Sequence, residues 1–268
     1  MNMIKKKPKK LIFNKSKFLD NKKYPKISVI TVVKNSQRFL EKTIKSVIHQ
    51  TYRNFEYIII DGNSNDNTQS IINKYKKHIN VYIRVKDKNL WEAMNLGIKA
   101  ANGSIIVFLN SDDTFTQKAL NYAANYFKNN RNLDFLFGTV FKHWLKSGFY
   151  PNKAYWSFNF YTTHSVGFFV KKNVHKKIGF YNENFLSADL DFFLRIIFSK
   201  KFTGVGTKKN QIFGNFRPGG FSSKVKYRKH LKDLNKIRIY NTQNRFIVYL
   251  IYLYKIIKSP RKFILNRH

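Results

Sequence analysis

The chain has 268 residues, 43% hydrophobic and 17% aromatic, which is enough for a sizeable core and excludes a disordered polypeptide. Cysteine is absent, which excludes disulfide bonds and thiolate metal sites. The formal net charge of +37 favours an anionic partner such as nucleic acid, a phosphorylated substrate or a membrane surface, although lysines spread evenly over a surface give the same total.

Basic residues are dense at both ends of the chain. Residues 1–26 contain ten Lys and one Asp, and residues 224–268 contain thirteen Lys or Arg and one Asp. The first residues lack the long apolar core and cleavage site of a secretory signal, so we expect none. The longest apolar run, residues 246–257, is short of the roughly 20 residues that cross a bilayer. These ends favour an anionic membrane surface.

Strand and helix patterns alternate from residue 26 onwards. Strands are predicted at 27–33, 55–60, 81–85 and 104–109, each followed by a helical pattern, the first at 36–50 and the third ending at Gly103. Further strands are predicted at 135–141 and 166–172, and helices at 116–127 and 190–198. This order predicts an α/β fold with a mostly parallel central sheet flanked by helices.

The composition suggests three segments. Residues 1–25 form a basic extension, residues 26–223 form one α/β domain, and residues 224–268 form a basic, amphipathic helical tail. Such a helix lies in a membrane interface, or it packs its apolar face on the domain.

Polar side chains follow four successive predicted strands. Asn35, Asp61, Asp87 and Asp112 each lie at or just beyond the carboxyl end of a strand. Open parallel sheets bind ligands at that edge, although turns are polar in any protein. The sequence therefore predicts a ligand site there.

Two adjacent carboxylates, Asp112 and Asp113, follow the buried run at 104–109. Adjacent carboxylates repel each other unless a cation lies beside them, and Mg²⁺ or Mn²⁺ takes one or two carboxylates together with substrate phosphates. Such an ion would neutralise charge on a departing diphosphate. Alternatively, Ser111 or Asp112 caps a following helix.

Four segments together resemble the family-2 glycosyltransferases of the GT-A (Rossmann-like) fold. They are "SVITVVKN", "YIIIDGNSNDNT", "DKNLWEAMNLGIKAANG" and "VFLNSDD". Within the family they are most similar to the colanic-acid and amylovoran biosynthesis branch. The resemblance covers roughly residues 26–225. It implies transfer of a sugar from a nucleoside-diphosphate sugar, which we expect to be UDP-linked, to a hydroxyl of a cell-surface glycan or lipid-linked saccharide, as in polysaccharide, lipopolysaccharide or capsule biosynthesis.

The resemblance also implies roles on the nucleotide side. The segment containing Thr31, Val33 and Asn35 would pack against the base, with Val32 where many members have proline. Asp61 would accept the ring N–H of the base, and Asp87 would be a further carboxylate on the nucleotide side. Many members have two adjacent aspartates where this sequence has Ile60 and Asp61.

The donor sugar and metal would be bound by later segments. Glu92 and Asn95 would line the sugar, although Glu92 is one carbon longer than the usual aspartate. Asn110, Ser111 and Asp112 occupy the D-x-D position, with asparagine replacing the first aspartate, so that Asp112 would be the main ligand of Mn²⁺ or Mg²⁺ and Asp113 a supporting one. Arg217, in a segment that resembles a "GGvS" loop, would reach phosphate, although glycines in a turn explain that loop equally well.

Asp189 matches the position of the family's general base. Transfer with inversion needs a carboxylate in line with the attacked carbon to take the proton of the acceptor hydroxyl. The alternative is that Asp189, or Asp191, caps the helix at 190–198. We expect Arg195 to pair with an acidic group.

These inferences predict a metal-dependent, inverting hexosyltransferase, peripheral on the cytoplasmic face of the inner membrane. The competing hypotheses are a nucleic-acid-binding protein and a non-catalytic scaffold of the same fold. Nucleic acid is disfavoured because no known binding motif is present and a phosphate backbone would repel carboxylates at the strand ends. Oligomeric state is not predicted.

Overall fold

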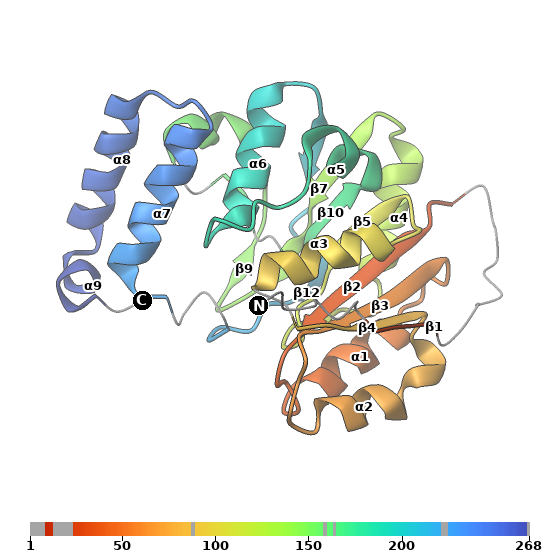
Figure 1. Ribbon diagram of the computed structural model, residues 1–268. Helices are drawn as coiled ribbons and strands as arrows, with labels where there is room; N and C mark the ends of the chain where they lie inside the picture. Colours follow the sequence, from red (N-terminus) through yellow and green to blue (C-terminus); the bar gives the residue numbers. More distant parts are fainter. Residues whose placement is uncertain are drawn as a thin grey trace, which may run out of the picture.

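The computed structural model describes residues 9–12, 24–86, 89–157, 160–162, 165–220 and 225–266 (Figure 1). Asp87 and most of the predicted N-terminal extension lie outside these residues. Eight strands form the central sheet in the order β1-β4-β3-β2-β5-β10-β7-β11, and four short strands form a second sheet in the order β6-β12-β8-β9.

The central strands are parallel, as predicted. β2 pairs with β3 and β5, β3 pairs with β4, and all of these pairs are parallel, whereas β10 runs antiparallel to both of its neighbours. The strands are β1 (Lys9–Ile12), β2 (Ile27–Val33), β3 (Phe55–Asp61), β4 (Val81–Arg84), β5 (Ile105–Phe108), β6 (Thr114–Phe115), β7 (Leu133–Phe137), β8 (Thr139–Phe141), β9 (Leu145–Lys146), β10 (Phe168–Lys171), β11 (Thr203–Gly206) and β12 (Ile212–Asn215).

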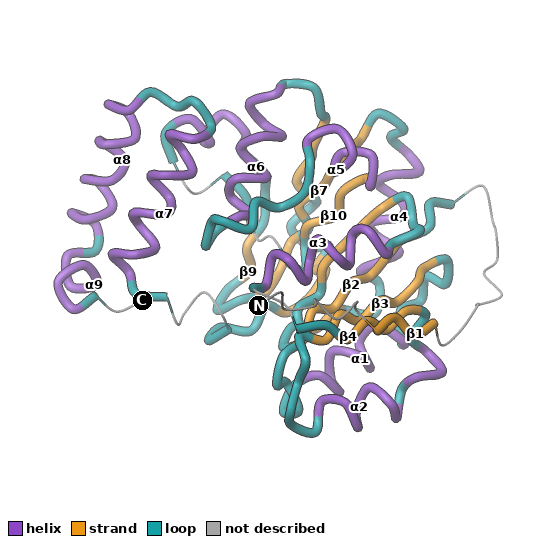
Figure 2. The backbone as a smooth tube through the Cα atoms, in the orientation of Figure 1, coloured by secondary structure: helices purple, strands orange, loops and turns teal. Residues whose placement is uncertain are grey.

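Helices cover both faces of the central sheet (Figure 2). The α-helices are α1 (Leu40–Ile48), α2 (Thr68–Lys74), α3 (Leu90–Ala100), α4 (Ala119–Asn129), α5 (Lys172–Ile178), α6 (Ala188–Ser199), α7 (Tyr227–Tyr240), α8 (Arg245–Lys258) and α9 (Pro260–Leu265), with short 3-10 helices η1 (Lys76–His78) and η2 (Pro151–Tyr155). Alternate residues of β2 enter two cores, Ile30 and Val32 packing with α3 and α6, and Val29 and Val33 with α1 and α4. This two-sided burial explains why the strand is apolar nearly throughout.

The predicted strand at 135–141 is in fact two strands. β7 ends and β8 begins on either side of Gly138, and the two belong to different sheets. A Cβ atom at Gly138 would lie 2.5 Å from the ring of Phe213, so the change of sheet requires a residue without a side chain.

The tail is helical and its first helix is part of the core. Leu231 and Ile237 of α7 are buried with residues of α6. Arg238 is fully buried and donates hydrogen bonds to the backbone oxygens of Ala154 and Ser157. Among the helices of the described ranges, none has the length and apolar character to cross a bilayer.

Substituting Gly97 by alanine is expected to destabilise the protein. Gly97 lies in α3 against the sheet, and a Cβ atom there would be 2.5 Å from Cγ2 of Ile30. Alanine favours a helix by about 1 kcal/mol over glycine, but overpacking costs about 1–3 kcal/mol, so the net change is a loss. Thermal and urea unfolding of Gly97→Ala measure it, with the exposed Asn125→Ala in α4 as control. A stability equal to or above that of the wild type would contradict the close packing of α3.

A buried histidine packs between α5 and α6. The side chain of His175 is 1% exposed, its ring stacks on Phe192 at 4.4 Å between centroids, and neither ring nitrogen has a hydrogen-bond partner in the described parts of the chain. Burial, assisted by the nearby charge of Arg195, lowers the pKa of His175 to about 3. The ring is therefore neutral in the folded protein.

His175 is expected to make folding sensitive to acid. The unfolded chain protonates this residue near pH 6.5, while the folded protein keeps it neutral down to about pH 3. Because the unfolded state binds the extra proton, stability falls as the pH decreases between these values, by up to about 1.4 kcal/mol per pH unit, and is unaffected above them. His175→Phe keeps the stacking and should flatten this part of the stability curve. The control, His78→Gln at an exposed position, should leave the stability curve unchanged. Identical curves for His175→Phe and the wild type would show that His175 does not cause the acid sensitivity.

Candidate functional site

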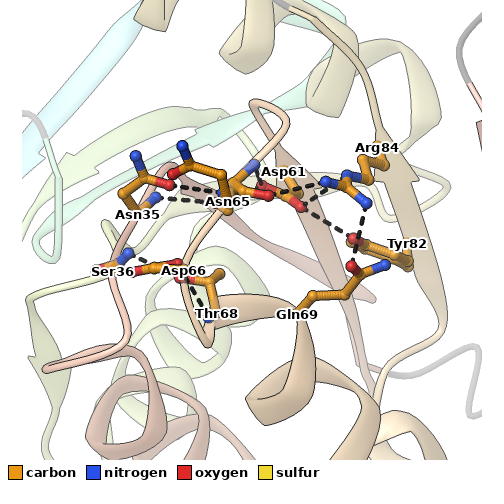
Figure 3. A network of polar contacts seen from close by, with 10 residues as sticks. Asn35, Ser36, Asp61, Asn65, Asp66, Thr68, Gln69, Tyr82 and Arg84 are labelled. Carbon is orange, nitrogen blue, oxygen red and sulfur yellow. Dashed lines mark hydrogen bonds and ion pairs between the residues drawn. The ribbon is translucent and has the colours of Figure 1, made fainter.

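Two loops that follow neighbouring strands are bonded to each other at the edge of the sheet (Figure 3). The backbone N–H of Asn35 donates to Oγ of Ser64 at 2.9 Å, and Oδ1 of Asn35 accepts from the N–H of Asn65 at 2.9 Å. The N–H of Ser36 donates to Oγ1 of Thr68 at 2.8 Å. Asn35 adopts φ +49°, a conformation that asparagine tolerates better than most residues. The polar turn after β3 is therefore fixed to the end of β2.

The buried side chain of Asp61 stabilises the turn after β3. This side chain is fully buried, Oδ1 accepts from the N–H and the hydroxyl of Ser64 at 2.9 and 2.6 Å, and Oδ2 accepts from the hydroxyl of Tyr82 at 3.0 Å. Nε of Arg84 lies 3.6 Å from Oδ2 (Figure 3). In this arrangement Asp61 has no exposed surface for a ligand.

Arg84 is a residue of the site that the sequence analysis missed. It ends β4, and its guanidinium donates to the backbone oxygen of Ser64 at 2.8 Å and to Oε1 of Gln69 at 3.1 Å. The side chain remains 31% exposed, so the cation borders the edge of the sheet as well as Asp61. The signal was present in the sequence, because an arginine ends an otherwise apolar strand.

Two residues of β2 that the resemblance assigns to the base are core residues. Thr31 is fully buried and its hydroxyl is 3.0 Å from that of Tyr57. Val33 is 4% exposed and packs against α1. Strand alternation directs both side chains into the same core, so among the three residues assigned to the base Asn35 alone has an exposed side chain.

The turn after β5 contains a buried carboxylate, Asp113. Its side chain is 1% exposed, Oδ1 accepts from the N–H of Arg217 at 2.8 Å, and Oδ2 accepts from the hydroxyl of Ser165 at 3.1 Å. Burial raises the pKa of Asp113 to about 7. Its backbone oxygen accepts from the hydroxyl of Thr43 at 2.7 Å. Asp113 thus joins distant segments around the turn, and its buried carboxyl group is not free to act as the supporting metal ligand that we predicted.

Asp112 is partly exposed and lies beside a cation. Nη1 of Arg217 lies 3.4 Å from Oδ2 of Asp112, and the guanidinium lies 3.8 Å from the ring centroid of Phe39. A Cβ atom at Gly220 would be 3.3 Å from the same oxygen. The glycine-containing loop at 217–220 therefore returns to the strand end, and brings Arg217 to the position where a phosphate group was expected.

A hard cation fits this turn in part. Oδ1 of Asn110 is buried without a hydrogen-bond partner, and the carboxylate of Asp112 is 19% exposed. Oxygen atoms of this kind suit Mg²⁺ or Mn²⁺. Within the described residues no cluster of three or more His, Cys, Asp or Glu side chains could hold a metal. An ion here would need further oxygen ligands from a substrate or water.

Neither Ser111 nor Asp112 caps a helix. Lys118 is at the N-cap of α4, several residues later. The backbone oxygen of Ser111 accepts from Oγ of Ser36 at 3.5 Å, which links this turn to the loop after β2.

Helix α3 holds the loop that precedes α6. Asn95 is 5% exposed, its Oδ1 accepts from the N–H of Tyr181 at 3.0 Å, and its Nδ2 donates to the backbone oxygen of the same residue at 2.9 Å. The amide that we assigned to the donor sugar is therefore used within the protein. Glu92, half-buried at the first turn of α3, lies on the same helix. Nε1 of Trp91 donates to the backbone oxygen of Leu186 at 3.3 Å.

Asp189 lies in the first turn of α6 and is 8% exposed. The N-cap of the helix is Ser187, so neither Asp189 nor Asp191 caps it. The Tyr161 hydroxyl bonds Asp189, and burial together with that carboxylate raises the pKa of Tyr161 well above its ordinary value. The tyrosine thus remains a neutral donor.

Asp191, two residues further along α6, is a structural carboxylate. Nε of Arg195 donates to its Oδ2 at 2.9 Å, and Nη2 forms an ion pair with the same oxygen at 2.9 Å, as predicted. Asn241 of the tail donates to Oδ1 at 2.9 Å. A second tail residue, Asp233 of α7, accepts the N–H groups of Leu186 and Ser187 at 3.1 and 2.8 Å. Helix α7 therefore fixes the beginning of α6.

Sequence comparisons identify the family of the chain. A family model for glycosyl transferase family 2 matches residues 28–195. The uncharacterized glycosyltransferase MJ1057 of Methanocaldococcus jannaschii is 29% identical over 189 residues, 65% of each chain. The poly(ribitol-phosphate) beta-N-acetylglucosaminyltransferase TarP of Staphylococcus aureus is 37% identical over 118 residues, 42% of this chain and 36% of TarP. The match thus spans only part of these relatives, and the colanic-acid branch stays a prediction.

Solved structures show the same fold. S. aureus TarS in complex with UDP-GlcNAc superposes with a TM-score of 0.63 at 17% identity, over 80% of this chain and 66% of that chain. The mannosyltransferase PcManGT of Pyrobaculum calidifontis, in complex with GDP-Man and Mn²⁺, superposes with a TM-score of 0.65 at 13% identity, over 90% of this chain and 73% of that one. The fold is GT-A, and the chain belongs to glycosyltransferase family 2.

Proposed function

We propose that the protein transfers a sugar from a UDP-linked donor to a hydroxyl group of a surface glycan or a lipid-linked saccharide, with inversion at the transferred carbon. The main observation in support of this proposal is that Asp112 lies beside Arg217 at the edge of a parallel sheet. A partly exposed carboxylate beside a cation suits a metal-bound diphosphate, and sheets of this kind bind ligands at that edge.

The nucleotide would lie along the two bonded loops that follow β2 and β3. Asn35 has an exposed side chain there, and Arg84 offers a partly exposed cation. For Asp61 to accept a hydrogen bond from the base, the turn at 63–65 would have to move aside, because Asp61 is fully buried. We therefore assign Asp61 to holding Arg84 and this turn in position.

The diphosphate would lie beside the turn at 110–113. Asp112 and Oδ1 of Asn110 would hold Mn²⁺ or Mg²⁺ together with phosphate oxygens, and Arg217 would contact the phosphates from the other side. The ion, when bound, supplies positive charge to the departing diphosphate. Arg217 adds a fixed cation at the same point.

Asp189 would be the general base. Its carboxylate would take the proton of the acceptor hydroxyl as the oxygen attacks the anomeric carbon. The neutral hydroxyl of Tyr161 donates to this carboxylate and orients it. The loop before α6, held by Asn95 and by Asp233, fixes the start of the helix that carries Asp189.

A panel of nucleotide sugars tests the proposal. UDP, GDP, dTDP and CMP sugars are compared by thermal shift with Mn²⁺, Mg²⁺ or EDTA, and by release of the nucleotide. Stabilisation and nucleotide release are expected with a UDP-sugar and a metal. Preference for a GDP-sugar would overturn the choice of nucleotide, and no response to any member of the panel would overturn the proposed activity.

Asp189→Asn is expected to lower the transfer rate by roughly 10²- to 10⁴-fold, because the amide cannot accept the acceptor proton. Nucleotide binding should be retained, since Asp189 contacts only the acceptor side in this mechanism. Initial rates and calorimetric titration with UDP measure the two effects. Asp191→Asn, on the same helix, is the control. It removes the ion pair with Arg195 and should lower stability, with activity retained by the folded fraction.

Asp112→Ala is expected to remove the metal-dependent part of donor binding. A tenfold weaker affinity lowers the stabilisation given by a saturating ligand by about 1.4 kcal/mol. The variant should therefore respond to UDP in Mn²⁺ no more than the wild type does in EDTA. Asp134→Asn, at the start of β7, is the control and should keep the full response. An unchanged Mn²⁺-dependent shift in Asp112→Ala would place the metal elsewhere.

A further inference from the structure

The outer face of helix α8 is apolar and exposed. Seen in Figure 1, α8 lies at the edge of the molecule beside α7 and α9. Its inner side chains Val248 and Ile251 are buried. The large side chains on the other side are exposed by 41 to 76%: Phe246, Ile247, Tyr249, Leu250, Tyr254 and Ile257. An exposed apolar face of this size is typical of a surface that contacts a partner or a membrane.

Helix α9 extends this apolar face. Ile264 and Leu265 are 69 and 62% exposed. The helix is fixed in place by Arg228 of α7, whose Nε donates to the backbone oxygen of Phe263 at 2.8 Å and whose guanidinium lies 4.8 Å from the Phe263 ring. The two exposed residues therefore belong to an ordered surface.

The same region is strongly basic. Asp233 is the only acidic residue in 224–268, and its carboxylate is used at the start of α6. Exposed Lys258, Arg261 and Lys262 lie at the end of α8 and in α9. This surface therefore has cations beside its apolar face and no nearby acidic residue of the tail to neutralise them.

We propose that the outer face of α8 and α9 docks on an anionic lipid bilayer, with the apolar side chains in the interface and the Lys and Arg residues on the lipid headgroups. The length of α8 disfavours a spanning role, because its 14 residues correspond to about 21 Å of helix, less than the roughly 30 Å of a hydrocarbon core. Its tyrosines, at positions 249, 252 and 254, favour the interfacial region. A bilayer fits better than a nucleic acid, which would leave the apolar face uncovered.

Vesicle flotation of the full chain tests this inference without any sugar donor, so its outcome is independent of the transferase assays. Vesicles contain either phosphatidylcholine alone or phosphatidylcholine with 30% phosphatidylglycerol. The wild type should float with the anionic vesicles and much less with the neutral ones. Phe246→Ser with Tyr254→Ser and Ile257→Ser should abolish flotation. Phe246→Leu with Tyr254→Phe and Ile257→Leu, which keeps the apolar surface, should not.

A second set of variants tests the charges. Lys258→Gln with Arg261→Gln and Lys262→Gln should weaken partitioning by roughly fivefold per charge. The control removes three exposed lysines on the α1, α2 and α4 side, Lys42→Gln with Lys76→Gln and Lys118→Gln, and should bind as the wild type does. Circular dichroism and thermal unfolding verify the fold of each variant.

Three results would overturn the inference. The first is failure of the wild type to float with anionic vesicles. The second is equal loss of binding in the two charge variants, which would reduce the effect to net charge. The third is a wild type that does not bind vesicles but forms a dimer in analytical ultracentrifugation, where the serine variant is a monomer. That result would identify the apolar face as a contact between two copies of the chain.

Discussion

The site depends on the hydrogen bonds that the buried side chain of Asp113 accepts. Removed from water at the end of β5, this side chain accepts the backbone N–H of Arg217 and the hydroxyl of Ser165, which are far apart in the sequence. A buried carboxyl group is costly unless its oxygens are hydrogen-bonded, so these segments are fixed at the strand end. The neighbouring Asp112 then faces outward beside Arg217. One carboxylate thus organises the turn and the other remains available to a ligand.

The edge of the sheet was predictable and its internal bonding was not. Apolar runs and the polar residues that follow them predicted β2 to β5 within a residue or two, because a strand covered on both faces is apolar throughout. The same pattern cannot distinguish an exposed strand-end residue from a buried one. Asp61 and Asp113 were assigned to ligands and are buried, whereas Asp112 is partly exposed. That distinction depends on which loops return to the edge.

Long-range packing accounts for the other differences. Tyr161 and Asp233 contribute to the surroundings of Asp189 from segments with no recognisable motif, so no local signal could find them. Asn95 lies in a recognisable motif, yet its amide bonds the backbone of Tyr181. Gly138 divides one predicted strand between two sheets because of Phe213, a residue 75 positions away. Sequence motifs located Asn95 and Asp189, and tertiary contacts determined the surroundings of both side chains.

The contacts of Asp233 and Asn241 give the basic tail a structural role in the α/β domain. Asp233 accepts the N–H groups at the start of α6, and Asn241 bonds the buried Asp191 in the same helix. Removing everything after residue 226, as one would to obtain a smaller and less basic fragment, would also remove the support of the helix that bears Asp189. Residues 227–268, about a sixth of the chain, thus support the helix that carries the proposed general base, and they cannot be removed without leaving the start of that helix unsupported.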